Sequence, residues 1–99
     1  MFISSSMVYE NSSNHCCSED TPLGKIANPY AIAKRKAEVM AEEYSKKHGM
    51  NITVLRVFTV YGPRQRPDMA FYRVYDDIRC GREVTIIGGE DAKSDFIYI

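Results

Sequence analysis

Tyr30 and Lys34 are the pair of residues whose types and spacing allow acid–base chemistry in this sequence. Residues four apart on a helix lie on the same face, one turn from each other. A free phenol has a pKa of about 10, too high for a base at neutral pH, but a nearby ammonium group lowers that value. The Y-x-x-x-K spacing therefore suits a tyrosine acid/base. Taken alone, it is also the spacing of an ordinary surface pair.

Serines and arginines follow two apolar segments, where a ligand could reach them. Ser4, Ser5 and Ser6 come at the end of the first segment, and Arg64 and Arg66 lie in a loop after the second. In open α/β sheets the ligand crevice lies beyond the carboxyl ends of the strands. A hydroxyl can bond a substrate oxygen, and the planar fork of arginine suits phosphate or carboxylate groups. Taken alone, loop serines and solvated charges are the simpler interpretation.

The remaining composition narrows the classes of function. Neither histidine has a partner at metal-ligand spacing and the three cysteines form no paired C-x-x-C, so no metal site is predicted. Thirteen basic residues balance thirteen acidic ones, which gives no reason to expect nucleic acid or an anionic membrane surface as a partner. The sequence has no signal peptide and no apolar run near the roughly 20 residues that span a bilayer. Reduced thiols in a cytoplasmic protein are expected.

A helix over residues 29–48 is predicted to carry the Tyr–Lys pair. Asn28 can cap its free N–H groups, and Pro29 suits the first helical position. Gly49 can adopt the left-handed turn that ends a helix. Apolar residues recur at steps of three and four and form one stripe, which consists of Tyr30, Ala33, Ala37, Met40 and Tyr44.

The other elements alternate strands with helices. Phe2, Ile3 and Val8 suit a short buried strand that ends in a polar loop, and residues 10–28 are a long loop. Residues 52–58, ITVLRVF, are typical of a buried parallel strand.

Beyond a turn-rich loop, Asp68 is predicted to cap a second helix over about 69–80, which Gly81 ends. Short strands are expected at 84–87 and from Phe96, with a turn at the glycine pair between them. The apolar side of the second helix consists of Phe71, Val74, Tyr75 and Ile78. This alternation predicts an α/β fold with a parallel sheet.

Four stretches then carry a resemblance: FISSSMVYE, NPYAIAKRKAE, LRVFTVYGPRQRPDMA and SDFIYI. In this order the chain resembles the extended short-chain dehydrogenase/reductase family, and is most similar to epimerases acting on UDP-glucuronate or UDP-glucose. The resemblance implies the C-terminal half of a Rossmann-like fold plus the start of a substrate-binding subdomain. Residues 1–60 would be a partial NAD-binding domain and residues 61–99 a partial substrate-binding region. The family's glycine-rich loop and adenosine site are absent, since no G-x-G-x-x-G follows a strand.

The resemblance also implies roles for individual residues. Tyr30 would be the acid/base acting on a sugar hydroxyl, and Lys34 would hold the nicotinamide ribose and lower the tyrosine pKa. Ser5 would bond the reacting sugar oxygen. The residues implied near NAD are Ser4, Tyr30, Lys34 and Val60. Those implied to contact the substrate are Ser5, Thr59 and Arg66.

The implied activity is NAD-dependent 4-epimerisation of a UDP-sugar. Hydride removal to NAD would give a transient keto-sugar, and hydride return to its other face would invert the centre. Dehydratase relatives carry Asp-Glu after the catalytic hydroxyl, where this chain has Ser6 and Met7, and methionine cannot transfer a proton. A dehydratase, decarboxylase or reductase of the same superfamily is the first alternative. A truncated chain without catalysis of its own is the second. Relatives commonly form dimers through helices that include the Tyr–Lys helix, so a homodimer is implied.

Overall fold

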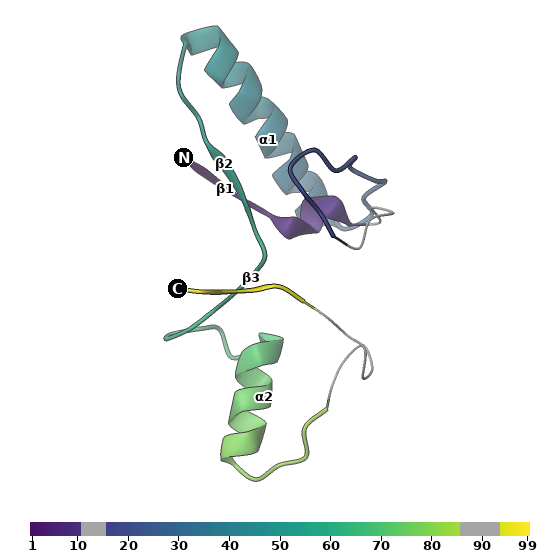
Figure 1. Ribbon diagram of the computed structural model, residues 1–99, viewed down its shortest axis with the longest axis vertical. Coiled ribbons are helices and arrows are strands. Elements are labelled where there is room, and N and C mark those ends of the chain that lie inside the picture. Colours follow the sequence, from purple (N-terminus) through teal and green to yellow (C-terminus); the bar gives the residue numbers. More distant parts are fainter. Residues whose placement is uncertain (11–15, 86–93) are drawn as a thin grey trace. The chain divides into compact units, whose positions relative to one another are not determined.

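The structure, a computed structural model, describes residues 1–10, 16–85 and 94–99. Its Cα packing divides the chain into two units, Met1–Phe58 and Thr59–Ile99. Each unit holds a pair of parallel strands and one α-helix, as Figure 1 shows. The chain therefore has the α/β alternation expected from its sequence.

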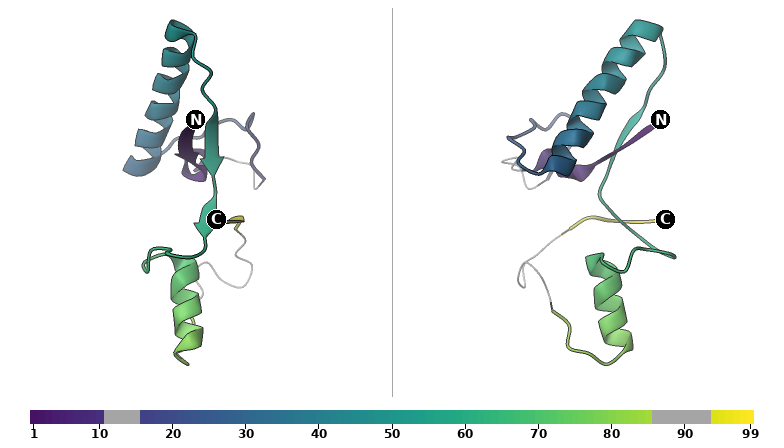
Figure 2. Two further views of the ribbon diagram at one scale, coloured as in Figure 1. Left: turned by 90° about the vertical axis from the view of Figure 1, so that its left-hand side faces the viewer. Right: turned by 180° about the vertical axis from the view of Figure 1, so that it is seen from behind.

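The first unit is built on two parallel strands, β1 (Phe2–Ser5) and β2 (Val54–Val57). Their register places Ser4 beside Arg56. Neighbouring residues of paired strands project to the same face of a sheet, so both side chains lie on one face. Helix α1 (Pro29–His48) runs along the two strands in Figures 1 and 2. It covers the face that carries Ser4 and Arg56.

The ends of α1 agree with the prediction from sequence. The Asn28 side chain accepts a hydrogen bond of 2.9 Å from the Tyr30 backbone N–H, and Pro29 opens the first turn. At the other end, Gly49 has a φ of 63°, a left-handed conformation that glycine adopts without steric cost. The helix therefore begins and ends where its own capping residues stand.

The apolar stripe of α1 is not the face that packs on the sheet. Tyr30, Met40 and Tyr44 are each more than half exposed. The packed face is instead the one that contains the completely buried Ala31 and the half-buried Glu38. Because this face meets the polar side chains of the strands, polar helix residues are favoured there, and periodicity alone indicated the wrong face.

The segment after β1 differs from the predicted polar loop. Residues Ser6–Tyr9 form a 3-10 helix, η1, whose N-cap is Ser5. The prediction that Val8 belongs to the first strand is wrong, although its side chain is completely buried. The chain turns because the Ser5 hydroxyl accepts a hydrogen bond of 3.2 Å from the Met7 N–H, which closes a short helical turn directly after the strand.

The second unit pairs strand β3 (Thr59–Tyr61) with strand β4 (Phe96–Tyr98), again in parallel. The predicted strand beginning at Phe96 is thus confirmed. The strand predicted at 52–58 is found as residues 54–57, which pair with β1, whereas residues 59–61, which the sequence did not predict as a strand, pair with β4. The chain changes pairing partner at this point, and the continuous apolar run in the sequence does not reveal that change.

Helix α2 (Ala70–Arg79) packs its first turn against β3. The ring centroids of Phe71 and Tyr61 lie 4.6 Å apart, and those of Tyr61 and Tyr98 lie 5.4 Å apart. Aromatic pairs at such separations stabilise packing beyond the area that they bury. Ile78 and Tyr75, on the predicted apolar side, are more than half exposed.

Asp68 does not cap α2, and that prediction is wrong. Met69 occupies the N-cap position and makes no side-chain capping bond. The Asp68 carboxylate instead binds the Arg66 guanidinium, at 3.0 Å from Nε and 2.5 Å from Nη2. A charged fork two residues away competes successfully for the carboxylate, because a charge-assisted bidentate contact is stronger than a bond to a neutral amide.

The remaining predicted strand, at residues 84–87, is not found where it can be assessed. Val84 and Thr85 lie in no strand. The other half of that prediction, together with the turn at Gly88 and Gly89, lies outside the described residues. Over the part of the chain that the structure describes, no helix is both long and apolar enough to cross a membrane.

The cap of α1 should contribute measurably to stability. The Asn28→Ala variant should lose about 1 kcal/mol of unfolding free energy, because one N–H group of the first turn loses its partner. Urea unfolding monitored by circular dichroism would measure this loss. Asp68→Ala is the matched control and should leave the helix content unchanged. A comparable loss in the control would show that Asp68 does cap α2.

Candidate functional site

Tyr30 lies in the first turn of α1 with its side chain accessible. Its backbone N–H is held by Asn28, and 53% of the residue is exposed to solvent. A phenol in this position can meet a ligand without any rearrangement of the fold. The capped helix start therefore fixes the backbone of Tyr30 and leaves its side chain open.

Lys34 brings its charge both to Tyr30 and to the first strand. Its Nζ donates a hydrogen bond of 2.9 Å to the Ile3 carbonyl of β1. The same atom lies 5.7 Å from the centroid of the Tyr30 ring and 5.4 Å from that of Phe2. An ammonium at these distances interacts favourably with an aromatic ring. The Lys34 ammonium and the Tyr30 ring are thus neighbours, and their catalytic roles stay a prediction.

Ser5 ends β1 and is almost buried. Its oxygen already accepts the hydrogen bond from Met7 N–H, which leaves its own hydroxyl proton for another acceptor. Because α1 packs against both β1 and η1, Ser5 shares one unit with Tyr30 and Lys34. The three residues predicted to be catalytic therefore come from elements in mutual contact.

Ser4 lies beneath α1, with 2% of the residue exposed. Its hydroxyl has no hydrogen-bond partner of normal geometry among the described residues. It nevertheless lies near enough to the Glu38 carboxylate to favour the charged form. The predicted contact of Ser4 with a cofactor stays a prediction.

An ion pair between Glu38 and Arg56 joins α1 to β2, and sequence reasoning missed it. Nη2 of Arg56 lies 2.8 Å from Oε2 of Glu38, and Nε lies 3.1 Å and 3.2 Å from the two carboxylate oxygens. The Arg56 side chain is 23% exposed and the Glu38 side chain is 10% exposed. The available signal was Arg56 itself, a charged residue within the apolar run at 52–58.

The charge of Glu38 is stabilised by its surroundings. Burial acts to raise the pKa of its carboxyl, but the hydrogen bonds of Arg56, the nearby Ser4 hydroxyl and the positive charges of Arg56 and Arg35 outweigh this effect. The net pKa of Glu38 is lowered. The same contacts raise the pKa of Arg56. Both partners are therefore charged at neutral pH.

The other predicted site residues belong to the second unit. Thr59 and Val60 are half-buried in β3, and the Val60 carbonyl accepts a hydrogen bond of 3.1 Å from Gln65 Nε2. Arg66 is exposed and held by Asp68, whose carboxylate raises the pKa of the guanidinium. Solvent screens such a surface pair strongly, so an anionic ligand could take the place of Asp68.

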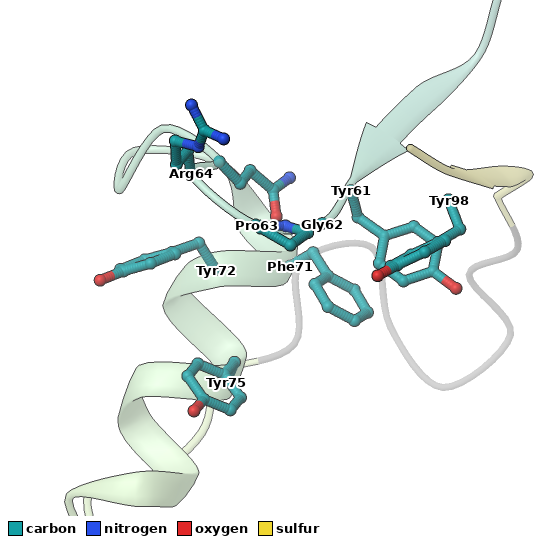
Figure 3. A pocket seen from close by; sticks show the side chains of 9 residues that line it. Tyr61, Gly62, Pro63, Arg64, Phe71, Tyr72, Tyr75 and Tyr98 are labelled. Carbon is teal, nitrogen blue, oxygen red and sulfur yellow. The ribbon is translucent and has the colours of Figure 1, made fainter.

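A pocket of about 350 Å³ in the second unit was also missed from sequence. Figure 3 shows the rings of Tyr61 and Tyr98 on one side and those of Tyr72 and Tyr75 on α2. Arg64, at its rim, has a φ of 64°, a left-handed conformation that costs free energy in any residue but glycine. The aromatic density of residues 61–75 was the signal in the sequence. In the described parts of the chain, no three potential metal ligands gather.

Known proteins are similar to this chain over its whole length. A family model described as the NAD dependent epimerase/dehydratase family matches residues 1–99. UDP-glucuronate 4-epimerase 5 of Arabidopsis thaliana is 39% identical over 102 residues, which cover 100% of this chain and 23% of that protein. The match to the family therefore extends over the whole of this chain.

Two solved structures are similar over nearly all of the chain. UDP-glucuronic acid 4-epimerase from Bacillus cereus, in complex with UDP-glucuronic acid and NAD, is 40% identical with a TM-score of 0.82 over 97% of this chain and 30% of that one. UDP-N-acetylglucosamine 4-epimerase from Methanobrevibacter ruminantium, in complex with UDP-N-acetylmuramic acid, is 30% identical with a TM-score of 0.86 over 98% and 32%.

The parallel strands, the covering helix and the Tyr–Lys pair define an α/β protein of the Rossmann type, as the sequence predicted. The chain belongs to the NAD-dependent epimerase/dehydratase family. It spans between 23% and 32% of the length of the three relatives described above.

The residues present fit one end of NAD, the cofactor of this family. The ammonium of Lys34 has three N–H donors and uses one of them on Ile3, so two remain for ribose hydroxyls beside the exposed Tyr30. The 99 residues contain no G-x-G-x-x-G to bind a pyrophosphate. The fit therefore extends to the nicotinamide ribose and no further.

Stability should fall on acidification because of Glu38. Its pKa in the folded chain lies below 4.5, its ordinary value, so the unfolded chain binds more protons and the unfolding free energy falls as pH drops below about 5. Above that range the contribution is complete. The Glu38→Gln variant should be less stable at neutral pH and show a shallower loss on acidification. Urea midpoints across this range measure the effect.

Glu43→Gln, on the exposed side of the same helix, is the control and should retain the wild-type pH dependence. Parallel curves for the wild type and Glu38→Gln would mean that the Glu38 carboxylate is not the group responsible.

Proposed function

We propose that the protein carrying this chain is an NAD-dependent 4-epimerase of a UDP-sugar, with UDP-glucuronate or UDP-glucose as the substrate class. The proposal rests on the position of Lys34, whose ammonium lies 5.7 Å from the centroid of the Tyr30 ring and donates a hydrogen bond to the Ile3 carbonyl of β1. That position puts a fixed positive charge next to an exposed phenol. The likeness to UDP-glucuronate 4-epimerases supports the choice of substrate.

In this proposal the residues of the chain hold and move a proton. Tyr30 takes the proton of the sugar hydroxyl at the reacting carbon and returns it, and Lys34 places its positive charge beside the Tyr30 ring. The Ser5 hydroxyl donates a hydrogen bond to the same sugar oxygen and so orients that oxygen towards Tyr30. Bound NAD would supply the removal and return of a hydride at the sugar carbon.

Thr59 and Arg66 are proposed to contact the nucleotide sugar. The Arg66 fork is exposed and already oriented by a carboxylate, so it can bind a substrate carboxylate or phosphate in a bidentate manner. Ser4 and Val60 are proposed to lie close to the nicotinamide end. Residues 1–60 would then belong to the cofactor-binding part and residues 61–99 to the substrate-binding part.

The alternative within the same family is a dehydratase, a decarboxylase or a reductase. Elimination of water needs a further acid and base next to the catalytic hydroxyl. The positions after Ser5 are Ser6 and Met7 in η1, neither of which carries a carboxylate. This local composition favours epimerisation over elimination.

The proposal also includes the location and assembly of the protein, which we expect to be cytoplasmic and a homodimer. Met40 and Tyr44, one turn apart on α1, are more than half exposed. Apolar side chains exposed side by side are typical of association surfaces, and closed two-fold dimers are the commonest assemblies.

Tyr30→Phe should remove most of the turnover in the full-length protein. The general acid–base contribution would fall by about 10²- to 10⁴-fold. Thermal unfolding should be unchanged because the lost hydroxyl belongs to an exposed side chain. The assay would follow the conversion of UDP-glucuronate to UDP-galacturonate.

Tyr44→Phe, farther along the same helix, is the matched control. Near-normal turnover of Tyr30→Phe would refute the role of the tyrosine. A product that has lost water or carbon dioxide would refute epimerisation and favour the alternative activities.

The second alternative, a chain without catalysis of its own, applies to the 99 residues in isolation. The isolated chain should bind NAD weakly, because it offers contacts to the nicotinamide ribose only, and it should associate through its exposed apolar residues. Calorimetry with NAD and analytical ultracentrifugation would measure these properties. Tight NAD binding by a monomer that unfolds cooperatively would contradict this expectation.

A further inference from the structure

Three residues of α1 stand in line along one helix face. Tyr30, Lys34 and Glu38 follow each other at intervals of four, so each lies one turn beyond the last. The first two form the proposed acid–base pair. The third makes the ion pair with Arg56 of β2. This row of side chains therefore runs from the exposed Tyr30 to a strong contact with the sheet.

The contact between Glu38 and Arg56 is directional. Nε and Nη2 of Arg56 both meet the carboxylate, at distances from 2.8 to 3.2 Å. Nη1 donates to the Tyr9 hydroxyl at 2.9 Å, and the guanidinium carbon lies 5.0 Å from the centroid of the Tyr9 ring. Arg56 thus joins α1, β2 and η1 through one planar group.

This contact lies next to the proposed catalytic serine. Arg56 is the register partner of Ser4, and the next pair along the strands is Ser5 with Val57. One turn earlier on the helix, Lys34 binds the carbonyl of Ile3. The turn that contains Lys34 is therefore attached to Ile3 of β1. The next turn is attached through Glu38 to Arg56 of β2, which is paired with Ser4 of β1.

Apolar packing alone would hold the helix less precisely. Ala31 is the one residue of α1 that is buried, and a single methyl group gives little resistance to sliding because hydrophobic contact has no preferred direction. A slide by one residue moves a helix by about 1.5 Å. That displacement would break the bidentate geometry of Glu38 and Arg56.

We propose that Glu38 and Arg56 are positioning residues, whose ion pair sets the axial position of α1 on β1 and so holds Lys34 on the Ile3 carbonyl and fixes the position of Tyr30 relative to Ser5. Tyr9 orients the arginine from its other edge. The catalytic consequence rests on the function proposed above. The structural consequence, the placement of Lys34 on Ile3, does not.

Two variants separate positioning from mere stability. Arg56→Lys keeps the charge but loses the fork. The double variant Glu38→Met/Arg56→Met removes both charges at similar volume, an exchange that is often neutral or stabilising for a buried pair. Glu42→Gln, which breaks the exposed pair with Lys46, is the control.

In the full-length protein, both variants should lower kcat for UDP-sugar epimerisation by about 10- to 100-fold, as expected for small misplacements of catalytic groups. KM should change little. Tm of the double variant should stay near the wild-type value. The control should keep both kcat and Tm.

The second measurement does not depend on activity. Nitrogen-15 NMR of the lysine ammonium groups reports the hydrogen bond of Lys34 to Ile3, and we expect its signal to shift and exchange faster with water in both variants. A double variant with normal kcat and an unchanged Lys34 signal would show that the pair only stabilises the fold. If that variant does not fold, the same result in Arg56→Lys overturns the proposal.

Absence of epimerisation in the wild type would refute the proposed function alone. The Lys34 signal would then still decide whether the ion pair positions the helix.

Discussion

The ion pair between Glu38 and Arg56 is the constraint on which the first unit depends. Both charges are removed from most of the surrounding water, and a buried charge is tolerated only when it is paired and hydrogen-bonded. The carboxylate receives the arginine fork, and the opposite edge of the fork meets the Tyr9 hydroxyl. A pair satisfied in this way costs desolvation free energy, but it allows only a narrow range of positions for the helix on the sheet.

Different residues along helix α1 make different contacts. Asn28 caps it, Tyr30 presents a phenol, Lys34 reaches the first strand and Glu38 reaches the second. Because Tyr30, Lys34 and Glu38 each lie about one turn beyond the last, a single rigid helix fixes their positions relative to the sheet. The second unit has a different basis, in which rings around Tyr61 pack two short strands against a helix.

The failures of sequence reasoning share a cause, which is competition among partners. Asp68 could have capped a helix, but Arg66 was close enough to bind it. The run at 52–58 was predicted as one strand, but a second strand at 59–61 follows it directly, and the two pair with different strands. The stripe that includes Met40 could have faced the sheet, but the strands present polar groups there. In each case the local pattern was real, and a competing partner decided how it was used.

The sequence by itself determined the α/β class, both ends of α1 and the spacing of Tyr30 and Lys34, because capping and helical periodicity act over a few neighbouring residues. It also contained the motifs that identify the family. Only the tertiary structure decided which face of α1 meets the sheet, that Lys34 binds the carbonyl of Ile3, and that Arg56 pairs with Glu38. These contacts join residues 18 and 31 positions apart, and local propensity carries no information about which of the available distant partners will meet.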